Sequence, residues 1–315
     1  MSDIVLTGKT FNQQYKGKKL VKLTNDLENH KGYQFQTGLN RNSRPFHSQG
    51  ECQASGISFC LLEKMPMWLN YTDTPMVYIR WVTIPNDALI CVEKDQFKAD
   101  QMILSERQKI GDLEEWKDPF YCLEAIQQQG CALQYVLEQT RELCLEAVKQ
   151  DGFALLYVKQ QTPELCLEAV RQNGLVLEYV LEQSLEICLE AVREDGCALE
   201  YVWEQDPELC LEVIRRNGCT LQYILEQTPE LCLEAVKQNG MALEHVLEQT
   251  PELCLEAVKQ NGFALRFVKE QTPQLCFEAI RQEGCALMYV EQQTSELCLE
   301  AVQQDGHASI YVKDM

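Results

Sequence analysis

Apolar residues recur with a fixed period of 22 residues from position 122 to the end of the sequence. Each unit carries two apolar stripes with the i, i+3, i+4 spacing of amphipathic helices. In the unit 228–249 these positions are Leu231, Cys232, Ala235 and Val236, then Ala242, Leu243 and Val246. Such a period is typical of stacked repeats, whose neighbouring units bury each other's apolar stripes. The pattern predicts a mostly α protein, with an α-solenoid of about nine helix-turn-helix units over residues 113–315.

Polar residues predict where the helices of each unit begin and end. Thr228 suits the N-cap, and Pro229 suits the first helical position, where its missing N–H costs nothing. Gly240 is expected to end this helix in the left-handed conformation. A second, shorter helix is expected over about 241–249. Because helices of this length are marginal alone, each unit depends on its neighbours for stability.

Nine of the 16 cysteines follow the same period. They are Cys122, Cys144, Cys166, Cys188, Cys210, Cys232, Cys254, Cys276 and Cys298. One thiol per layer suits neither a disulfide, which needs Cα atoms within about 7 Å, nor a four-ligand zinc site. We therefore interpret the cysteines as small core residues in a reducing compartment. Four others, Cys131, Cys197, Cys219 and Cys285, follow the repeat glycine, where apolar packing is also expected.

The net charge of −20 belongs entirely to the repeats, because residues 1–120 contain fifteen basic and fifteen acidic side chains. Two polar ladders follow the period and are candidate binding residues. They include Glu146, Glu168, Glu190, Glu212, Glu234 and Glu256, with Gln183, Gln205 and Gln227. We favour a solvated face, with glutamate–Lys/Arg pairs three residues apart and glutamines bonded across the inter-repeat turns. The alternative is an acidic groove for a basic protein segment. Nucleic acid is disfavoured, because acidic surfaces repel phosphate.

The regular pattern is interrupted near the middle of the array. Trp203 stands where neighbouring units have leucine, and Asp206 replaces the capping threonine. Arg215 and Arg216 interrupt the acidic pattern, and Val213 replaces an alanine kept in the other eight units. Trp203 either fills a packing gap, which we favour, or anchors an interface, a role in which tryptophan is common.

The first 112 residues lack the period and are expected to form a small α+β domain. Strands are predicted by β-branched and aromatic runs at 4–7, 20–24, 33–36, 77–84 and 88–92. The segment 59–70 is interpreted as a short helix broken near Pro66, and 98–110 as a further strand or helix.

The chemistry of this N-terminal region is sparse. His47, Cys52 and Cys60 match no compact zinc spacing, so no metal is expected, and no cofactor either. The sequence contains no phosphate-binding glycine loop and neither the HExxH nor the GxSxG motif.

The repeat TPELCLEAVKQNG, at 228–240 and 250–262, resembles an uncharacterised repeat family of giant amoeba-infecting DNA viruses. The segments 19–40, 56–64 and 82–106 resemble the domain that precedes repeats in those viral proteins. This resemblance implies an intracellular viral product that acts as a host-interaction factor, and it implies no established reaction.

The N-terminal order of a glycine-rich turn, GISF strand, helix, VYIRWVTIP strand and late ILSE strand is similar to the ADP-ribosyltransferase-like fold. In such enzymes a late glutamate holds the nicotinamide ribose, and Glu106 is the matching catalytic candidate. The cofactor-binding His or Arg motif has no clear counterpart here.

The sequence favours a non-catalytic protein–protein interaction scaffold with an extended acidic surface. It shows neither an apolar run long enough to span a membrane nor a signal peptide. We expect a cytoplasmic or virion-associated protein, monomeric or weakly self-associating, that binds neither nucleic acid nor membranes. The alternatives are an N-terminal transferase whose target the repeats recruit, and a structural protein of the virion.

Overall fold

A computed structural model describes residues 4–30, 33–42, 56–70 and 75–313. The chain forms two compact units, Met1–Gln161 and Thr162–Met315. The first unit contains a β-rich part and the first helical layers, so the predicted domain boundary after residue 112 falls inside it. The second unit consists of helical layers alone.

The β-rich part is built on one antiparallel sheet, in which strands follow the order β1-β8-β9-β6-β2-β7-β10-β5 and β11 pairs with β7. The strands are β1 (Ile4–Thr7), β2 (Leu20–Thr24), β5 (Gly38–Arg41), β6 (Ile57–Leu61), β7 (Tyr78–Thr83), β8 (Leu89–Val92), β9 (Phe97–Ala99), β10 (Gln101–Leu104) and β11 (Gln108–Lys109). A separate two-stranded antiparallel sheet pairs β3 (Asn29–His30) with β4 (Tyr33–Gln34).

Aromatic packing forms the core of this part. The helix α1 (Gly8–Gln14) places Phe11 against Phe59 of β6 and Phe97 of β9, with ring centroids 5.9 and 5.0 Å apart. Both pairs meet edge to face, a favoured aromatic geometry.

The strand predictions are largely confirmed, and two segments differ. The predicted helix over 59–70 is strand β6 followed by the 3-10 helix η1 (Leu62–Trp68). The sequence did not reveal α1, which contains only seven residues and has Thr7 as its N-cap. A region expected to be α+β is thus β-rich.

The first helical layer packs directly on the β-rich part. The buried Trp116, from η3 (Glu114–Lys117), stacks on Tyr135 with ring centroids 5.3 Å apart and donates Nε1–H to the Ile110 carbonyl at 2.8 Å. Gln128 donates to the Glu63 carbonyl at 2.9 Å. These contacts give the first layer a partner on the side where no preceding repeat exists.

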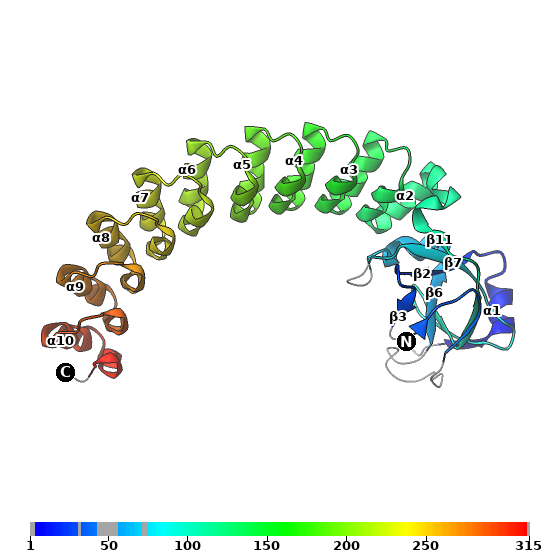
Figure 1. Ribbon diagram of the computed structural model, residues 1–315, viewed down its shortest axis with the longest axis horizontal. Coiled ribbons are helices and arrows are strands. Elements are labelled where there is room, and N and C mark those ends of the chain that lie inside the picture. Colours follow the sequence, from blue (N-terminus) through cyan, green and yellow to red (C-terminus); the bar gives the residue numbers. More distant parts are fainter. Residues whose placement is uncertain (1–3, 31–32, 43–55, 71–74, 314–315) are drawn as a thin grey trace. The chain divides into compact units, whose positions relative to one another are not determined.

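Every layer pairs a ten-residue α-helix with a six-residue 3-10 helix, and equivalent helices of neighbouring layers in the second unit lie side by side (Figure 1). The first unit contains α2 (Pro119–Gln128), η4 (Gly130–Tyr135), α3 (Arg141–Gln150) and η5 (Gly152–Tyr157). The second contains α4 (Pro163–Gln172), η6 (Gly174–Tyr179), α5 (Leu185–Glu194), η7 (Gly196–Tyr201), α6 (Pro207–Arg216), η8 (Gly218–Tyr223), α7 (Pro229–Gln238), η9 (Gly240–His245), α8 (Pro251–Gln260), η10 (Gly262–Phe267), α9 (Pro273–Gln282), η11 (Gly284–Tyr289), α10 (Ser295–Gln304) and η12 (Gly306–Tyr311).

The predicted start of the repeat helix is confirmed: Thr228 accepts the Leu231 N–H, and Pro229 is the first helical residue. The predicted second helix is shorter than expected, because η9 is a single 3-10 segment that ends at His245. Asn239 caps this segment by accepting the Met241 N–H at 3.0 Å. Among the described residues, no helix combines the length and apolar character that crossing a bilayer requires.

The prediction of a left-handed Gly240 is wrong. Among the described residues, positive φ is confined to Glu28, Gly17, Gly38 and Gly56. The structure requires glycine at this position for a different reason: a Cβ on Gly240 would lie 2.4 Å from the carbonyl oxygen of Ala257 in the next layer. The repeat glycine therefore permits close approach between layers.

Replacing Gly240 with alanine is expected to lower the free energy of unfolding by about 2 kcal/mol, because the methyl group must push adjacent layers apart. Gly306 occupies the same repeat position in the last layer, where an added Cβ meets nothing within 4 Å. Gly306→Ala is thus the matched control and is expected to be neutral or slightly stabilising. Urea denaturation of both variants tests this, and equal effects would contradict the close-approach explanation.

Candidate functional site

The inter-repeat loops of the second unit expose a row of large apolar side chains. Leu181, Trp203, Leu225 and Leu247 occupy equivalent positions and are 66%, 64%, 73% and 67% exposed. Each begins the short loop that leads into the next α-helix. We call the four segments 180–186, 202–208, 224–230 and 246–252 the Trp203 edge.

Hollows lie between successive loops of the Trp203 edge. Three of them have volumes of about 590, 620 and 450 Å³. Apolar side chains line each hollow: Leu185 and Trp203 the first, Leu211 and Leu225 the second, and Leu233 and Leu247 the third. The edge therefore presents a series of apolar pockets at the period of the layers.

The surroundings of these hollows are strongly acidic. The four segments of the Trp203 edge contain eight glutamates and Asp206 and have neither lysine nor arginine. Glu204, Glu226 and Glu248 line the hollows. In the following layer the equivalent of Leu247 is Lys269, whose ammonium group donates to the Leu247 carbonyl at 2.9 Å. A cation thus ends the apolar row on that side.

A half-buried glutamine fixes the position of each of the exposed residues Trp203, Leu225 and Leu247. Gln205 donates from Nε2 to the Leu199 carbonyl of its own layer at 3.1 Å and to the Tyr223 carbonyl of the next at 2.8 Å. Its Oε1 accepts the Leu225 N–H at 2.9 Å. Gln183 and Gln227 make the equivalent bonds. The interpretation that the glutamines bond across inter-repeat turns is confirmed.

The repeat cysteine completes this glutamine brace. Cys188 and Cys232 are buried, and each thiol donates to the Oε1 of the glutamine five residues before it, at 3.7 and 3.6 Å. Burial raises the pKa of both thiols, so they are poor nucleophiles. The packing interpretation fits these cysteines. It fails at Cys197, which is exposed.

The predicted glutamate ladder lies on the α-helices, away from the Trp203 edge. All six candidates are half-buried: Glu146, Glu168, Glu190, Glu212, Glu234 and Glu256. Two accept from an arginine of the preceding layer, as Arg171 Nε lies 3.0 Å from Glu190 and Arg215 Nε lies 3.5 Å from Glu234. The expected pairing within one helix is weaker, at 4.0 Å for Arg193 and Glu190. This ladder contributes mainly to layer stacking.

Trp203 does not fill a packing gap, and the favoured interpretation is wrong, because most of its side chain is exposed. It lies in the loop between α5 and α6, which contact each other less closely than other neighbouring α-helices of the second unit. Val213 and Thr220 explain this separation. A Cβ added to Gly196 would lie 3.9 Å from the side chain of Val213 and 2.9 Å from that of Thr220. At the equivalent Gly240, the nearest atom to such a Cβ is a backbone carbonyl oxygen instead.

A second bond is altered at this α5–α6 junction. Gln238, Gln260 and Gln304 each accept the N–H of the repeat glycine in the preceding layer, as Gln260 does from Gly240 at 2.6 Å. Arg216 occupies that position in α6 and has no acceptor to offer. It donates instead to the Arg193 carbonyl at 2.9 Å.

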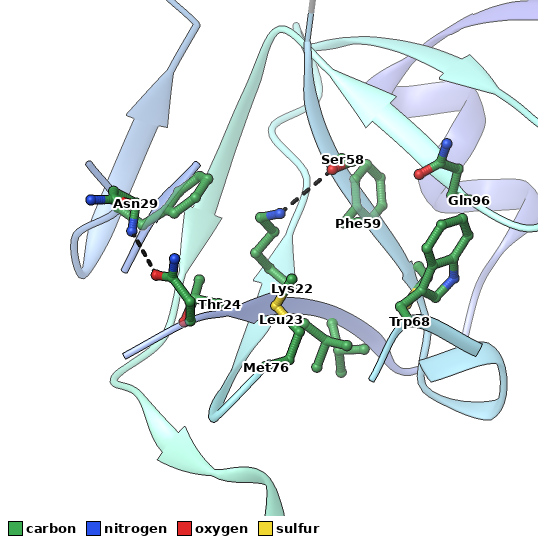
Figure 2. Close-up of a pocket in the computed structure, with 13 residues that line it drawn as sticks. Lys22, Leu23, Thr24, Asn29, Ser58, Phe59, Trp68, Met76 and Gln96 are labelled. Atoms are coloured by element: carbon green, nitrogen blue, oxygen red, sulfur yellow. Dashed lines mark hydrogen bonds between the residues drawn. The ribbon is translucent and has the colours of Figure 1, made fainter. Parts of the chain in front are cut away.

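A separate pocket lies in the β-rich part, beside β2 and β6. The pocket is partly open, its volume is about 60 Å³, and its lining includes Lys22, Ser58, Phe59, Cys60 and Trp68. We call it the Lys22 pocket. Figure 2 shows the Lys22 side chain between Asn29 on one side and Phe59 and Trp68 on the other.

Lys22 is a buried amine, only 7% exposed. Burial lowers its pKa to about 8, and the neighbouring Cys60 opposes this with a smaller effect. Burial also raises the pKa of Cys60 to about 12. Lys22 was not among the predicted site residues, because a lysine within a strand pattern gives no sign that it faces inward.

The other predicted site residues do not converge. Glu106 is exposed in the loop between β10 and β11 and is not among the residues that line the Lys22 pocket. His47 and Cys52 lie outside the described residues, while Cys60 is buried. In the described ranges, no group of three or more His, Cys, Asp or Glu side chains is arranged to hold a metal ion.

Five overlapping segments match a family described as Domain of unknown function (DUF4116): residues 140–185, 184–227, 206–249, 228–272 and 250–293. Their starting positions are separated by 22 or 44 residues, so the matches follow the structural layers. No curated protein and no solved structure matches the chain significantly. The comparisons thus support a helical repeat family.

Replacing Gln205 with alanine is expected to lower the free energy of unfolding by about 2 kcal/mol, since the carbonyl and N–H groups that it joins lose their partners. The adjacent Glu204 is exposed, and Glu204→Ala is the control, expected to change stability by less than about 0.5 kcal/mol. Thermal and urea denaturation measure both. Similar stability of the two variants would contradict the brace.

Replacing Lys22 with methionine is expected to stabilise the protein at pH 7, by up to about 3 kcal/mol, because it removes a buried cation. Between its folded pKa of about 8 and its ordinary value of 10.5, the unfolded lysine binds more protons than the folded one. The wild-type protein therefore regains this stability as pH rises through that range. Urea denaturation at pH 7 and pH 10 measures the difference. A difference independent of pH would contradict the burial effect.

Proposed function

We propose that the protein is a non-catalytic interaction scaffold that binds a basic, partly apolar segment of a protein partner along the Trp203 edge. The observation that carries this proposal is the row of exposed Leu181, Trp203, Leu225 and Leu247 beside apolar hollows in an acidic surface. Soluble proteins rarely expose large apolar side chains in continuous rows unless the surface is used in binding.

The charge of the edge selects the partner. Eight glutamates and one aspartate surround the row, so a partner segment with lysine or arginine between its apolar residues is complementary. Phosphate backbones and anionic membrane surfaces are repelled by the same charges. Long-range attraction speeds the encounter, and burial of apolar side chains in the hollows provides most of the affinity.

The layer spacing selects the form of the segment. Packed helices are separated by about 8–10 Å. An extended segment in the polyproline II conformation has three residues per turn and rises about 9 Å per turn, so every third side chain lies on the same face. An extended segment with an apolar residue at every third position therefore meets one hollow per triplet. The glutamine brace holds the hollows in register, so little conformational entropy is lost in the scaffold when the segment binds.

The resemblance of the repeat to giant-virus proteins extends this proposal. In that setting the partner is a host protein, and the scaffold acts in the cytoplasm of the infected cell or is carried by the virion. The match to a repeat family of unknown function is compatible with this role.

A labelled peptide of four Leu-Lys-Arg triplets tests the edge by fluorescence anisotropy. We expect it to bind the full chain at least tenfold more tightly than a peptide of four Ser-Lys-Arg triplets, which has the same charge. Trp203→Ala is expected to reduce this affinity about tenfold, the usual effect of losing an interface anchor. Its unfolding midpoint is expected to stay near that of the wild type.

Two control variants separate the edge from general surface effects. Leu299 is 61% exposed on α10, outside the Trp203 edge, and Leu299→Ala is expected to leave peptide binding unchanged. Glu226→Gln, which removes a charge from the Trp203 edge, is expected to weaken peptide binding. Glu244→Gln, which removes a charge from η9 outside the edge, is expected to leave peptide binding unchanged. If the leucine and serine peptides bind equally, or if Trp203→Ala and Leu299→Ala behave alike, the proposal is wrong.

A further inference from the structure

The Lys22 pocket contains a buried cation without an acidic partner among the described residues. The Lys22 ammonium lies 3.5 Å from Ser58 Oγ and 4.9 Å from the centroid of the Phe35 ring. These contacts replace only part of the hydration that the ammonium loses on burial. The pocket therefore holds a positive charge whose counter-ion is missing from the described chain.

The neighbouring strand shows how a cation of this sheet is otherwise stabilised. Arg80 of β7 pairs directly with Lys22 in the ladder. Its guanidinium group forms a bidentate ion pair with Glu28, at 2.8 and 3.0 Å, and also donates to Thr37 at 3.0 Å. The charge of Arg80 is thus neutralised by Glu28 within the fold. Lys22 has no such partner among the described residues and lines a pocket instead.

We propose that the Lys22 pocket binds a small aromatic carboxylate, with the carboxylate on the Lys22 ammonium and the ring against Phe59 and Trp68. The Lys22 pocket shares no residue with the Trp203 edge. The ligand supplies the missing negative charge, and the cost of burying the lysine is recovered when the ligand binds.

The polar lining fits a carboxylate. Its two oxygens accept several hydrogen bonds at once, and the pocket offers donors besides the amine. Ser58 supplies a hydroxyl group, and Asn25, Asn29 and Gln96 line the pocket with side-chain amides. The pocket is partly open, and its volume of about 60 Å³ has room for about four water molecules or for the carboxylate group of a ligand whose ring extends toward the opening.

The remaining walls fit a flat apolar body. Phe35 and Phe59 are buried, and Trp68 and Met76 complete the lining. In Figure 2, Phe59 and Trp68 lie on the same side of the Lys22 side chain. Apolar walls around a few convergent polar groups are characteristic of small-molecule sites.

A structural role for Lys22 alone explains the pocket less well. A methionine of similar length preserves the apolar contacts of the side chain without burying a charge. A lysine that destabilises the unliganded fold is better explained by a function that uses the charge.

Benzoate is the probe that tests the pocket in the full chain, and benzamide is its uncharged analogue. We expect benzoate to raise the melting temperature with a saturable concentration dependence, since a ligand that binds only the folded state stabilises it. Benzamide is expected to have at most a tenth of the affinity. Titration calorimetry is expected to give a stoichiometry of one.

Lys22→Met is expected to weaken benzoate binding at least tenfold and to remove the preference over benzamide, while the variant stays folded. Lys9→Met, at an exposed position of α1, is the control and is expected to bind as the wild type does. Ser58→Ala, which leaves the charge in place, is expected to weaken binding less than Lys22→Met. The proposal is overturned if benzoate shows no saturable binding, if benzamide binds as well, or if Lys22→Met binds benzoate unchanged.

Discussion

The regular structure of the second unit depends on one amide group per layer. The side chain of each bracing glutamine joins a carbonyl of its own layer, a carbonyl of the next and an N–H of the next. An amide is the smallest side-chain group that both donates and accepts in this way, so glutamate, lysine or leucine would leave part of the set unpaired. The brace fixes the loops, and the loops hold Leu181, Trp203, Leu225 and Leu247 in register. The geometry of the surface that we propose for binding is thus set by the hydrogen bonds of the glutamines that lie beneath it.

Much of the fold is readable from the sequence because the period repeats the same local signals. Thr228 and Pro229 correctly predict a helix start, and strands at 4–7, 20–24 and 88–92 follow from their β-branched residues. The end of the repeat helix shows where local rules fail. Glycine after a helix usually indicates a left-handed cap, but Gly240 is required by the carbonyl of Ala257, which lies 17 residues further along the chain in the adjacent layer. A contact between layers has no local signature.

The candidate sites were harder to predict than the fold, for a related reason. The glutamate and glutamine ladders share one period, and the sequence cannot tell which side of a layer each ladder occupies. The structure assigns the glutamines to the interior of the loops and the helix glutamates to stacking contacts. In the sequence, the exposed row of the Trp203 edge appears only as a repeat position that carries leucine in three units and tryptophan in one. Lys22 had no pattern at all, because its inward direction is set by the pairing of β2 with β6 and β7.

The α5–α6 junction has a consequence for how the stack responds to force and heat. In a repeat array, cooperativity depends on the free energy of each interface between neighbours. Val213, Thr220 and Arg216 weaken one interface, and the half-exposed Gly196 and exposed Cys197 lie beside it. The α5–α6 junction is therefore the weakest interface between neighbouring layers of the second unit. Strain applied along the layers would concentrate at this interface and bend the second unit at the loop that carries Trp203. The same junction therefore controls both the shape of the Trp203 edge and the mechanical response of the stack.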